Sequence, residues 1–318
     1  MKRKMCYVGL MIMSPYINAN DSVGYVATSG VQYIKNKNIQ MYSEELYINK
    51  DLIKVDYQFK NLTDKDITEN ILFPLPRVEN YTDMDYADTE ALLKSFQVKV
   101  NGKNIQPVMH VRAYLQYGNV DVEKPKHIDI TAEFKKCGLS QQDLLNPWTR
   151  KMTDPDYYWQ KIKQCNNPNI NKYFSPDQDA LEWSAEVIYS WQQSFKANAL
   201  TRVQHQYQPL VGGSVSMYMP EDQKTFCIDQ AFKKALAKRK ADVTPYSALG
   251  YVLTTGAHWA TPIAHFKVTV ERDVGELVSF CWKGKVNKIS PTKFEMLETN
   301  FVPTQDLNII FVKPIKLE

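Results

Sequence analysis

The sequence has 318 residues, with 39 Lys and Arg against 35 Asp and Glu, and 44% of it is hydrophobic. Three of the basic residues stand at positions 2–4, so the rest of the chain carries 36 basic against 35 acidic residues. A chain this close to neutral lacks the general positive charge of proteins that bind nucleic acid. The length suffices for a large core divided between two subdomains.

The first twenty residues have the organisation of a secretory leader. The basic positions 2–4 precede an apolar run over 5–13, Ser14 and Pro15 end that run, and Ala19 supplies a small residue at a cleavage site. The run is much shorter than the ~20 residues that cross a bilayer, and no later stretch resembles a transmembrane segment. We therefore expect a signal peptide over 1–19 and export to the periplasm or the medium.

Four cysteines follow the expected leader: Cys137, Cys165, Cys227 and Cys281. An even number in an exported chain favours disulfides, and four cysteines allow three pairings. None of the spacings is CxxC, so neither a zinc ribbon nor a thioredoxin motif is present. We favour the pairs Cys137–Cys165 and Cys227–Cys281, because each bond then lies within one region of the chain.

The range 20–130 has the pattern of an N-terminal β-sandwich domain. In "LIKVDYQFKN" (52–61) apolar residues alternate with polar ones, which is typical of a strand with one buried face. Asn101 and Gly102, between two further short strands, predict a type I′ hairpin because both tolerate positive φ. Short strands with turns at this spacing favour antiparallel sheets.

The range 131–184 predicts a small helical insertion, in which Thr131 caps a helix that Gly138 ends. Strand patterns return in 185–318, a C-terminal β domain interrupted by one amphipathic helix over 229–242. The predicted fold class is mainly β, or β-rich α+β. We expect two antiparallel β-sandwich-like domains, a helical insertion and one amphipathic helix.

The stretch "RVQHQYQPLVGGSV" (202–215) resembles an active site in composition. However, Val203, His205 and Tyr207 share one face of a strand, which predicts a packed histidine, while the polar residues at 202, 204 and 206 share the other face. Gly212 and Gly213 follow and most simply permit a turn or bulge. The glycines lack the strand–GxGxxG–helix context of a dinucleotide-binding loop.

Two further groups could hold metal ions. His258 and His265 are seven residues apart, but a third ligand is not evident, and a loop pinned to the core by Trp259 is the simpler interpretation. The acidic run at 83–90 (Asp83, Asp85, Asp88, Glu90) departs from the EF-hand spacing and predicts a solvated loop. We therefore predict no metal and no cofactor. A cysteine nucleophile would need a free thiolate, which an oxidising compartment disfavours.

Nine segments together carry a family resemblance: "NDSVGYVATSGVQYIKNKNIQMYSEELYI", "VDYQFKNLTDKDITENILFPLP", "ITAEFKKCGL", "VQHQYQPLVGGSV", "TFCIDQ", "YVLTTGAHWATPI", "VSFCWKG", "ISPTKFEM" and "TNFVPTQDLNIIF". The chain resembles the bacterial family named domain of unknown function 4424, from Asn20 to Phe311. The resemblance implies an exported bacterial protein and supplies no catalytic residues. The segment "YQFKNLTDKDITENILFPLP" is also similar to the opening of vault/inter-alpha-trypsin-type sandwich domains, which favours an interaction role.

These observations predict a non-catalytic binding or assembly module of the cell envelope. Its partner would be another envelope protein or an extracellular ligand, not nucleic acid. The residues expected to make contacts are Tyr207, Gly212, Gly213, His258 and Trp259. The alternative is a secreted hydrolase whose base is His205 or His258, and a third possibility is a secreted protein directed at a host.

The leader and the cysteines can be tested together by the intact mass of the exported protein, before and after reduction. We expect a chain that begins at Asn20, gains two hydrogens per disulfide on reduction and is not alkylated without reductant. A retained leader, or alkylation of Cys227 and Cys281 without reductant, would contradict export into an oxidising compartment.

Overall fold

The computed structural model describes residues 22–27, 30–80, 89–117, 126–151, 154, 156–173 and 183–316. The expected leader and most of the acidic run at 83–90 lie outside these described residues. The described chain forms three β-sheets and a set of short helices, which confirms the predicted β-rich α+β class.

The first sheet has six strands in the order β2-β1-β5-β10-β8-β9, all paired antiparallel. Its strands are β1 (Ser22–Ala27), β2 (Gly30–Ile34), β5 (Ile67–Glu79), β8 (Val108–Tyr117), β9 (Lys126–Asp129) and β10 (Trp183–Phe195). The first nine residues of β10 are all buried, so neighbouring structure covers both faces of this central strand.

The second sheet has eight strands in the order β16-β17-β14-β3-β4-β11-β6-β7. Its strands are β3 (Ile39–Ile48), β4 (Ile53–Asn61), β6 (Gln97–Val100), β7 (Lys103–Ile105), β11 (Leu200–Tyr207), β14 (Ile263–Glu271), β16 (Asn287–Lys288) and β17 (Lys293–Phe301). β14 pairs with β3 in parallel, against the antiparallel expectation. Strands from the ranges 20–130 and 185–318 share this sheet, because β4 pairs with β11 and β3 with β14.

The third sheet has the order β12-β13-β18-β15, with β12 (Gly212–Ser214), β13 (Tyr246–Tyr251), β15 (Leu277–Phe280) and β18 (Leu307–Val312). Helices α7 (Glu221–Thr225) and α8 (Gln230–Arg239) accompany it. Phe232 of α8 belongs to a small apolar cluster with Leu277 and Ile310 of the sheet. The side chain of Asp229 accepts a hydrogen bond from the Phe232 amide (2.7 Å) and begins α8 within the predicted range.

Most of the other helices lie in the predicted helical range: α2 (Thr131–Lys136), α3 (Gln141–Leu144), α4 (Asn146–Thr149), α5 (Tyr157–Cys165) and α6 (Pro168–Asn171), besides α1 (Thr89–Ser95) and the 3₁₀ helix η1 (Thr254–His258). Trp148 of α4 donates its indole N–H to the Ala185 carbonyl of β10 (3.1 Å). The predicted cap at Thr131 is wrong, because Ile130 holds that position and the Thr131 hydroxyl accepts from the Ala113 amide instead (2.9 Å).

The short-range expectations for a hairpin and for two disulfides are confirmed. Asn101 and Gly102 have φ of 47° and 80° and join β6 to β7. Cys137 is bonded to Cys165, which ties the end of α2 to the end of α5, and Cys227 is bonded to Cys281, which ties the α7–α8 connection to the end of β15. Each disulfide therefore links segments of the same region.

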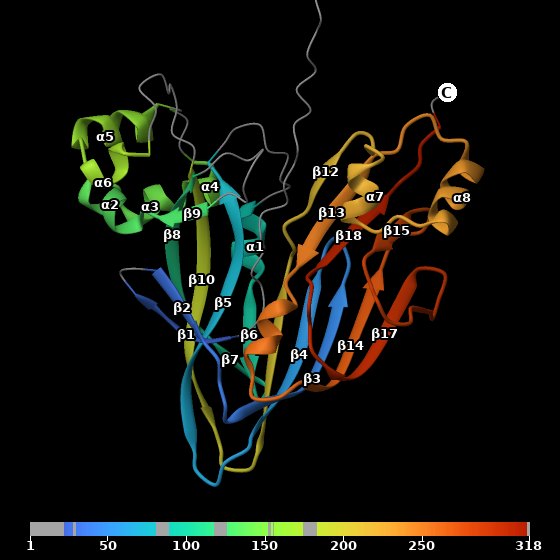
Figure 1. Cartoon of the computed structure of the whole chain (residues 1–318), viewed down its shortest axis with the longest axis horizontal. Coiled ribbons are helices and arrows are strands. Elements are labelled where there is room, and N and C mark those ends of the chain that lie inside the picture. Colours follow the sequence, from blue (N-terminus) through green and yellow to red (C-terminus); the bar gives the residue numbers. More distant parts are fainter. Residues whose placement is uncertain are drawn as a thin grey trace, which may run out of the picture.

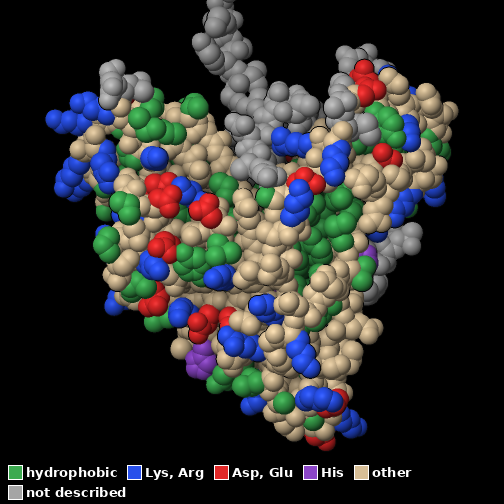
Figure 2. Space-filling view, turned by 180° about the vertical axis from the view of Figure 1, so that it is seen from behind, with side chains coloured by type: hydrophobic (Ala, Val, Ile, Leu, Met, Phe, Trp, Pro, Cys, Tyr) green, Lys and Arg blue, Asp and Glu red, His purple; other side chains and the backbone are tan. Residues whose placement is uncertain are grey.

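The main core lies on the inner face of the eight-stranded sheet. Figure 1 shows the six-stranded and eight-stranded sheets meeting at one end of the molecule and diverging toward the other. At the diverging end, α2 to α6 lie by the six-stranded sheet, and α7 and α8 lie beside the third sheet. Seen from behind, basic and acidic side chains are interspersed over the surface (Figure 2). Phe59 of β4 packs against Phe195 of β10, and Trp191 of β10 packs against His205 of β11. None of the helices in the described part of the chain is long and apolar enough to cross a membrane.

The two glycines of β12 offer a matched test of how closely β12 approaches β13 in the third sheet. A Cβ on Gly213 would clash with the Tyr246 carbonyl oxygen of β13, whereas a Cβ on Gly212 would meet nothing within 4 Å. We expect Gly213→Ala to lower the free energy of unfolding by roughly 1–3 kcal/mol. Gly212→Ala should leave it unchanged or raise it slightly. Equal effects in urea denaturation would contradict a close approach of these strands at Gly213.

Candidate functional site

The outward face of the eight-stranded sheet contains a shallow hollow of about 360 Å³. Five adjacent strands line it: β6, β11, β4, β3 and β14. The opposite face of the same strands carries the main core, and side chains alternate between the two faces along each strand. The polar half of the alternating pattern therefore builds the hollow.

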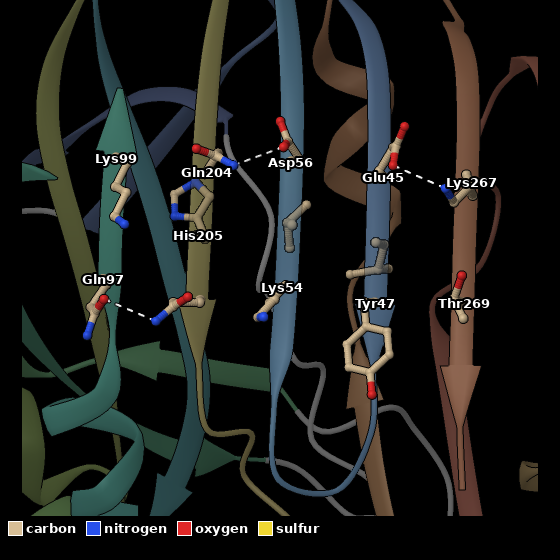
Figure 3. A pocket seen from close by; sticks show the side chains of 13 residues that line it. Glu45, Tyr47, Lys54, Asp56, Gln97, Lys99, Gln204, His205, Lys267 and Thr269 are labelled. Atoms are coloured by element: carbon tan, nitrogen blue, oxygen red, sulfur yellow. Dashed lines mark hydrogen bonds and ion pairs between the residues drawn. The ribbon is translucent and has the colours of Figure 1, made fainter. Parts of the chain in front are cut away.

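Strand register arranges the polar side chains of the hollow in two parallel rows (Figure 3). The first row, from β6 to β14, is Lys99, Gln204, Asp56, Glu45 and Lys267. The second row is Gln97, Gln206, Lys54, Tyr47 and Thr269. The positions between the rows are Val98, His205, Val55, Leu46 and Val268, which point into the core.

Hydrogen bonds and ion pairs hold several of these side chains in place. Asp56 accepts hydrogen bonds from Arg202 Nε (2.8 Å) and from the side-chain amide of Gln204 (2.9 Å). Lys267 pairs with Glu45 at 3.2 Å, and Gln206 donates to the Gln97 side chain at 3.1 Å. Side chains that are anchored in this way lose less conformational entropy when a ligand arrives.

Tyr47 of β3 stands between Lys54 and Thr269 in the second row. Its hydroxyl donates to a carboxylate oxygen of Glu271, and Glu271 also pairs with Lys293 at 3.4 Å. Partial burial, followed by the bond to Glu271, raises the pKa of Tyr47 to about 12. Tyr47 is protonated at neutral pH, as a tyrosine with the ordinary pKa also is, and it presents a neutral aromatic ring beside the hollow.

His205 lies below the floor of the hollow, on the core side. It is 2% exposed, and its ring stacks on Phe73 with centroids 4.9 Å apart. The rings of Tyr57, Phe96 and Trp191 also pack around it. The prediction of a packed histidine is confirmed, because a catalytic base must reach its substrate and this ring is covered by aromatic side chains.

Two of the residues expected to bind a ligand belong to the core. Tyr207 is 3% exposed, and its ring lies beside those of Phe73 and Phe96. Trp259 is 2% exposed and packs against Phe59, with ring centroids 4.5 Å apart. The expectation for Trp259, a ring that pins its loop to the core, is confirmed. Neither side chain offers surface to a ligand in this conformation.

The other expected contact residues lie on different elements. Gly212 and Gly213 form part of β12 at the edge of the third sheet, where they pair with β13. His258 ends η1, and its carbonyl accepts from the Asn36 amide (2.8 Å). None of the three lines the hollow. A binding role for Gly212, Gly213 and His258 stays a prediction.

Of the residues considered as metal ligands, His258, His265 and Glu90 lie in the described part of the chain. In the described ranges, no three His, Cys, Asp or Glu side chains are grouped so that they could hold a metal ion. Asp83, Asp85 and Asp88 lie outside the described residues. Glu90, the fourth member of that run, pairs with Lys94 at 2.9 Å and with Lys151 at 3.5 Å.

A second polar cluster lies on the six-stranded sheet. Arg77, Glu186 and Arg112 are opposite one another on β5, β10 and β8, and Arg112 pairs with Asp129 of β9 through Nε at 2.8 Å. Arg77 lies 3.9 Å from Glu186 and also over the Tyr114 ring. Burial raises the pKa of Glu186, against the attraction of Arg77. The cluster links four strands and is separate from the hollow.

The sequence contains a signal for the side chains of the hollow but not for the hollow itself. Alternation in 52–61 and in 202–207 identifies Lys54, Asp56, Gln204 and Gln206 as outward side chains. It does not reveal which strands are neighbours, so it cannot join these residues into one surface.

Fold and site together define a β-rich protein of three sheets with a polar hollow on its largest sheet. Residues 19–310 match the family described as "Domain of unknown function (DUF4424)", and the chain belongs to this family. No curated protein matches the sequence significantly.

Solved structures show only distant similarity. A Legionella pneumophila protein proposed to bind nutrients has 14% identity and a TM-score of 0.39, with 92% of this chain and 72% of that chain covered. A two-domain M1 zinc metallopeptidase variant bound to L-tryptophan has 10% identity and a TM-score of 0.29, with 87% and 44% covered. The Deinococcus radiodurans M1 zinc metallopeptidase has 10% identity and a TM-score of 0.25, with 87% and 43% covered. At these TM-scores the similarities carry no conclusion about function.

The half-buried His258 makes stability depend on pH. Burial, and then the charge of Lys35, lowers the pKa of His258 below 6.5. The unfolded chain therefore binds a proton here at a higher pH than the folded chain, and stability falls as pH drops from 6.5 toward the folded pKa. We expect His258→Gln to show a shallower loss of stability between pH 6.5 and 5 in urea denaturation. Part of the loss should persist, since burial also lowers the pKa of His110 and His127. An unchanged slope would contradict this assignment.

Proposed function

We propose that the protein is an exported, non-catalytic binding module of the bacterial cell envelope, and that its ligand occupies the hollow on the eight-stranded sheet. The observation that carries the proposal is the pair of polar rows on five adjacent strands. Ligand sites commonly use fixed polar groups on a rigid scaffold to orient what they bind. Here the strands supply the scaffold, and the bonds at Asp56 and Glu45 hold the polar groups.

Export is supported by the disulfides and by the N-terminal sequence. The bonds Cys137–Cys165 and Cys227–Cys281 pair every cysteine beyond the expected leader, and such bonds persist in oxidising compartments. The basic and apolar organisation of residues 1–19 agrees with passage through a secretion system.

Binding is a better proposal than hydrolysis with a histidine base. His205 is 2% exposed among aromatic rings, so its ring nitrogens are not presented to a substrate. His258 is half-buried at the end of η1 and does not line the hollow.

The test is a titration of the ¹⁵N-labelled mature protein with the non-protein fraction of an envelope extract from the producing bacterium. We expect shifts of amide signals to concentrate in β4, β6 and β11, around the hollow. Gln206→Ala should weaken the binding measured from these shifts several-fold, because it removes one side-chain amide of the second row. Gln208→Ala is the matched control, since Gln208 is exposed just beyond the hollow. Shifts centred on another surface, or equal losses in both variants, would contradict the proposed site.

A further inference from the structure

We propose that the hollow binds an acidic oligosaccharide, and that Lys54 and Lys99 each receive one of its negative charges. This inference rests on the proposed function and adds the chemical class of the ligand. It follows from which charges of the hollow are neutralised within the protein and which are not.

The acidic side chains of the hollow already have cationic partners. Asp56 is paired with Arg202, and Glu45 is paired with Lys267 at 3.2 Å. Asp56 also accepts from the Gln204 amide, so its oxygens are largely engaged. These carboxylates are poorly placed to bind a cation, and the pairs lower the negative potential of the hollow.

Two cations of the hollow remain without such partners. Among the described residues, Lys54 and Lys99 form no ion pair and no hydrogen bond, and both border the hollow. Figure 3 shows Lys99 and Lys54 on either side of β11, with Gln204 near Lys99. Two unneutralised ammonium groups give this end of the hollow a positive potential, which attracts an anion.

The positions of the lysines favour an extended anion. Lys54 and Lys99 are separated by two strand spacings of about 4.8 Å and by two residues of about 3.4 Å along the strands, so their Cα atoms are about 12 Å apart. A chain of acidic sugars carries charges on separate units and can place one at each lysine. A single small anion can contact both only if the two side chains converge.

The neutral groups beside the two lysines suit sugar hydroxyls. Gln206 donates to Gln97, which leaves the amide oxygen of Gln206 and the amide nitrogen of Gln97 available. A hydroxyl both donates and accepts, so it can satisfy each of these groups. The Tyr47 ring lies on the same face and can pack on a sugar ring.

The experiment compares a charged and a neutral trisaccharide, trigalacturonate and maltotriose, in titrations of the ¹⁵N-labelled mature protein at low ionic strength. We expect trigalacturonate to bind at the hollow at least tenfold more tightly than maltotriose, and we expect its affinity to fall as salt is added. Lys54→Gln and Lys99→Gln should each weaken it roughly three- to tenfold, because each removes one charge-assisted contact. The affinity for maltotriose should change neither with salt nor with these substitutions.

Lys60→Gln is the control, because Lys60 lies on the same strand and face as Lys54 but outside the hollow. Equal losses in Lys60→Gln and Lys54→Gln would mean diffuse charge attraction and overturn the inference. Equal binding of both trisaccharides, unaffected by Lys54→Gln and Lys99→Gln, would overturn the acidic class while the binding function stands. If neither trisaccharide shifts the amides of the hollow, the saccharide inference is wrong, and the extract titration still decides the proposed function on its own.

Discussion

The antiparallel pairing of β4 with β11 is the constraint on which the rest of the structure depends. It joins residues 53–61 to residues 200–207 across more than a hundred intervening positions. On one face the pairing places Tyr57 and Phe59 with His205 in the aromatic core. On the other face it places Asp56 beside Gln204 and so begins the polar rows. A slip of one residue would exchange the two faces of the shifted strand, because side chains alternate with a period of two.

The large core that this pairing creates resists such a slip. Phe73 and Trp191 of the six-stranded sheet pack around His205, so both large sheets contribute to one aromatic cluster. Moving His205 to the outer face would uncover these rings and bury the outward side chains of β11, Arg202, Gln204 and Gln206, which is strongly unfavourable without partners. The register of the hollow is therefore stabilised by residues that no ligand on the outer face would touch.

Charge pairing within the outer face decides what kind of ligand the hollow suits. Arg202 neutralises Asp56, and Lys267 neutralises Glu45. The other two lysines of the hollow, Lys54 and Lys99, lie on either side of β11. The near-neutral composition of the chain gives no indication of this local imbalance, since it arises from which residues are neighbours. A surface with weak net charge can in this way hold a region of positive potential.

The sequence by itself determined the local features of this protein. Alternation identified the buried and outward faces of the strands, Asn101-Gly102 identified a hairpin, and the cysteine positions led to both disulfide pairs. These features depend on residues that are close in the chain or on a simple count. The packed state of His205 was also predictable, because its apolar neighbours share its face.

Only the tertiary structure decided which strands are neighbours, and with them the site. The sequence separated the ranges 20–130 and 185–318, whereas strands from both share the largest sheet. Tyr207 and Trp259 stood out as contact residues, yet folding buries both. Lys54, Lys99 and Gln204 did not stand out, although folding brings them together on one face. The physical reason is that an alternating pattern specifies the face of a side chain and not the partner of its strand, which depends on packing over the whole core.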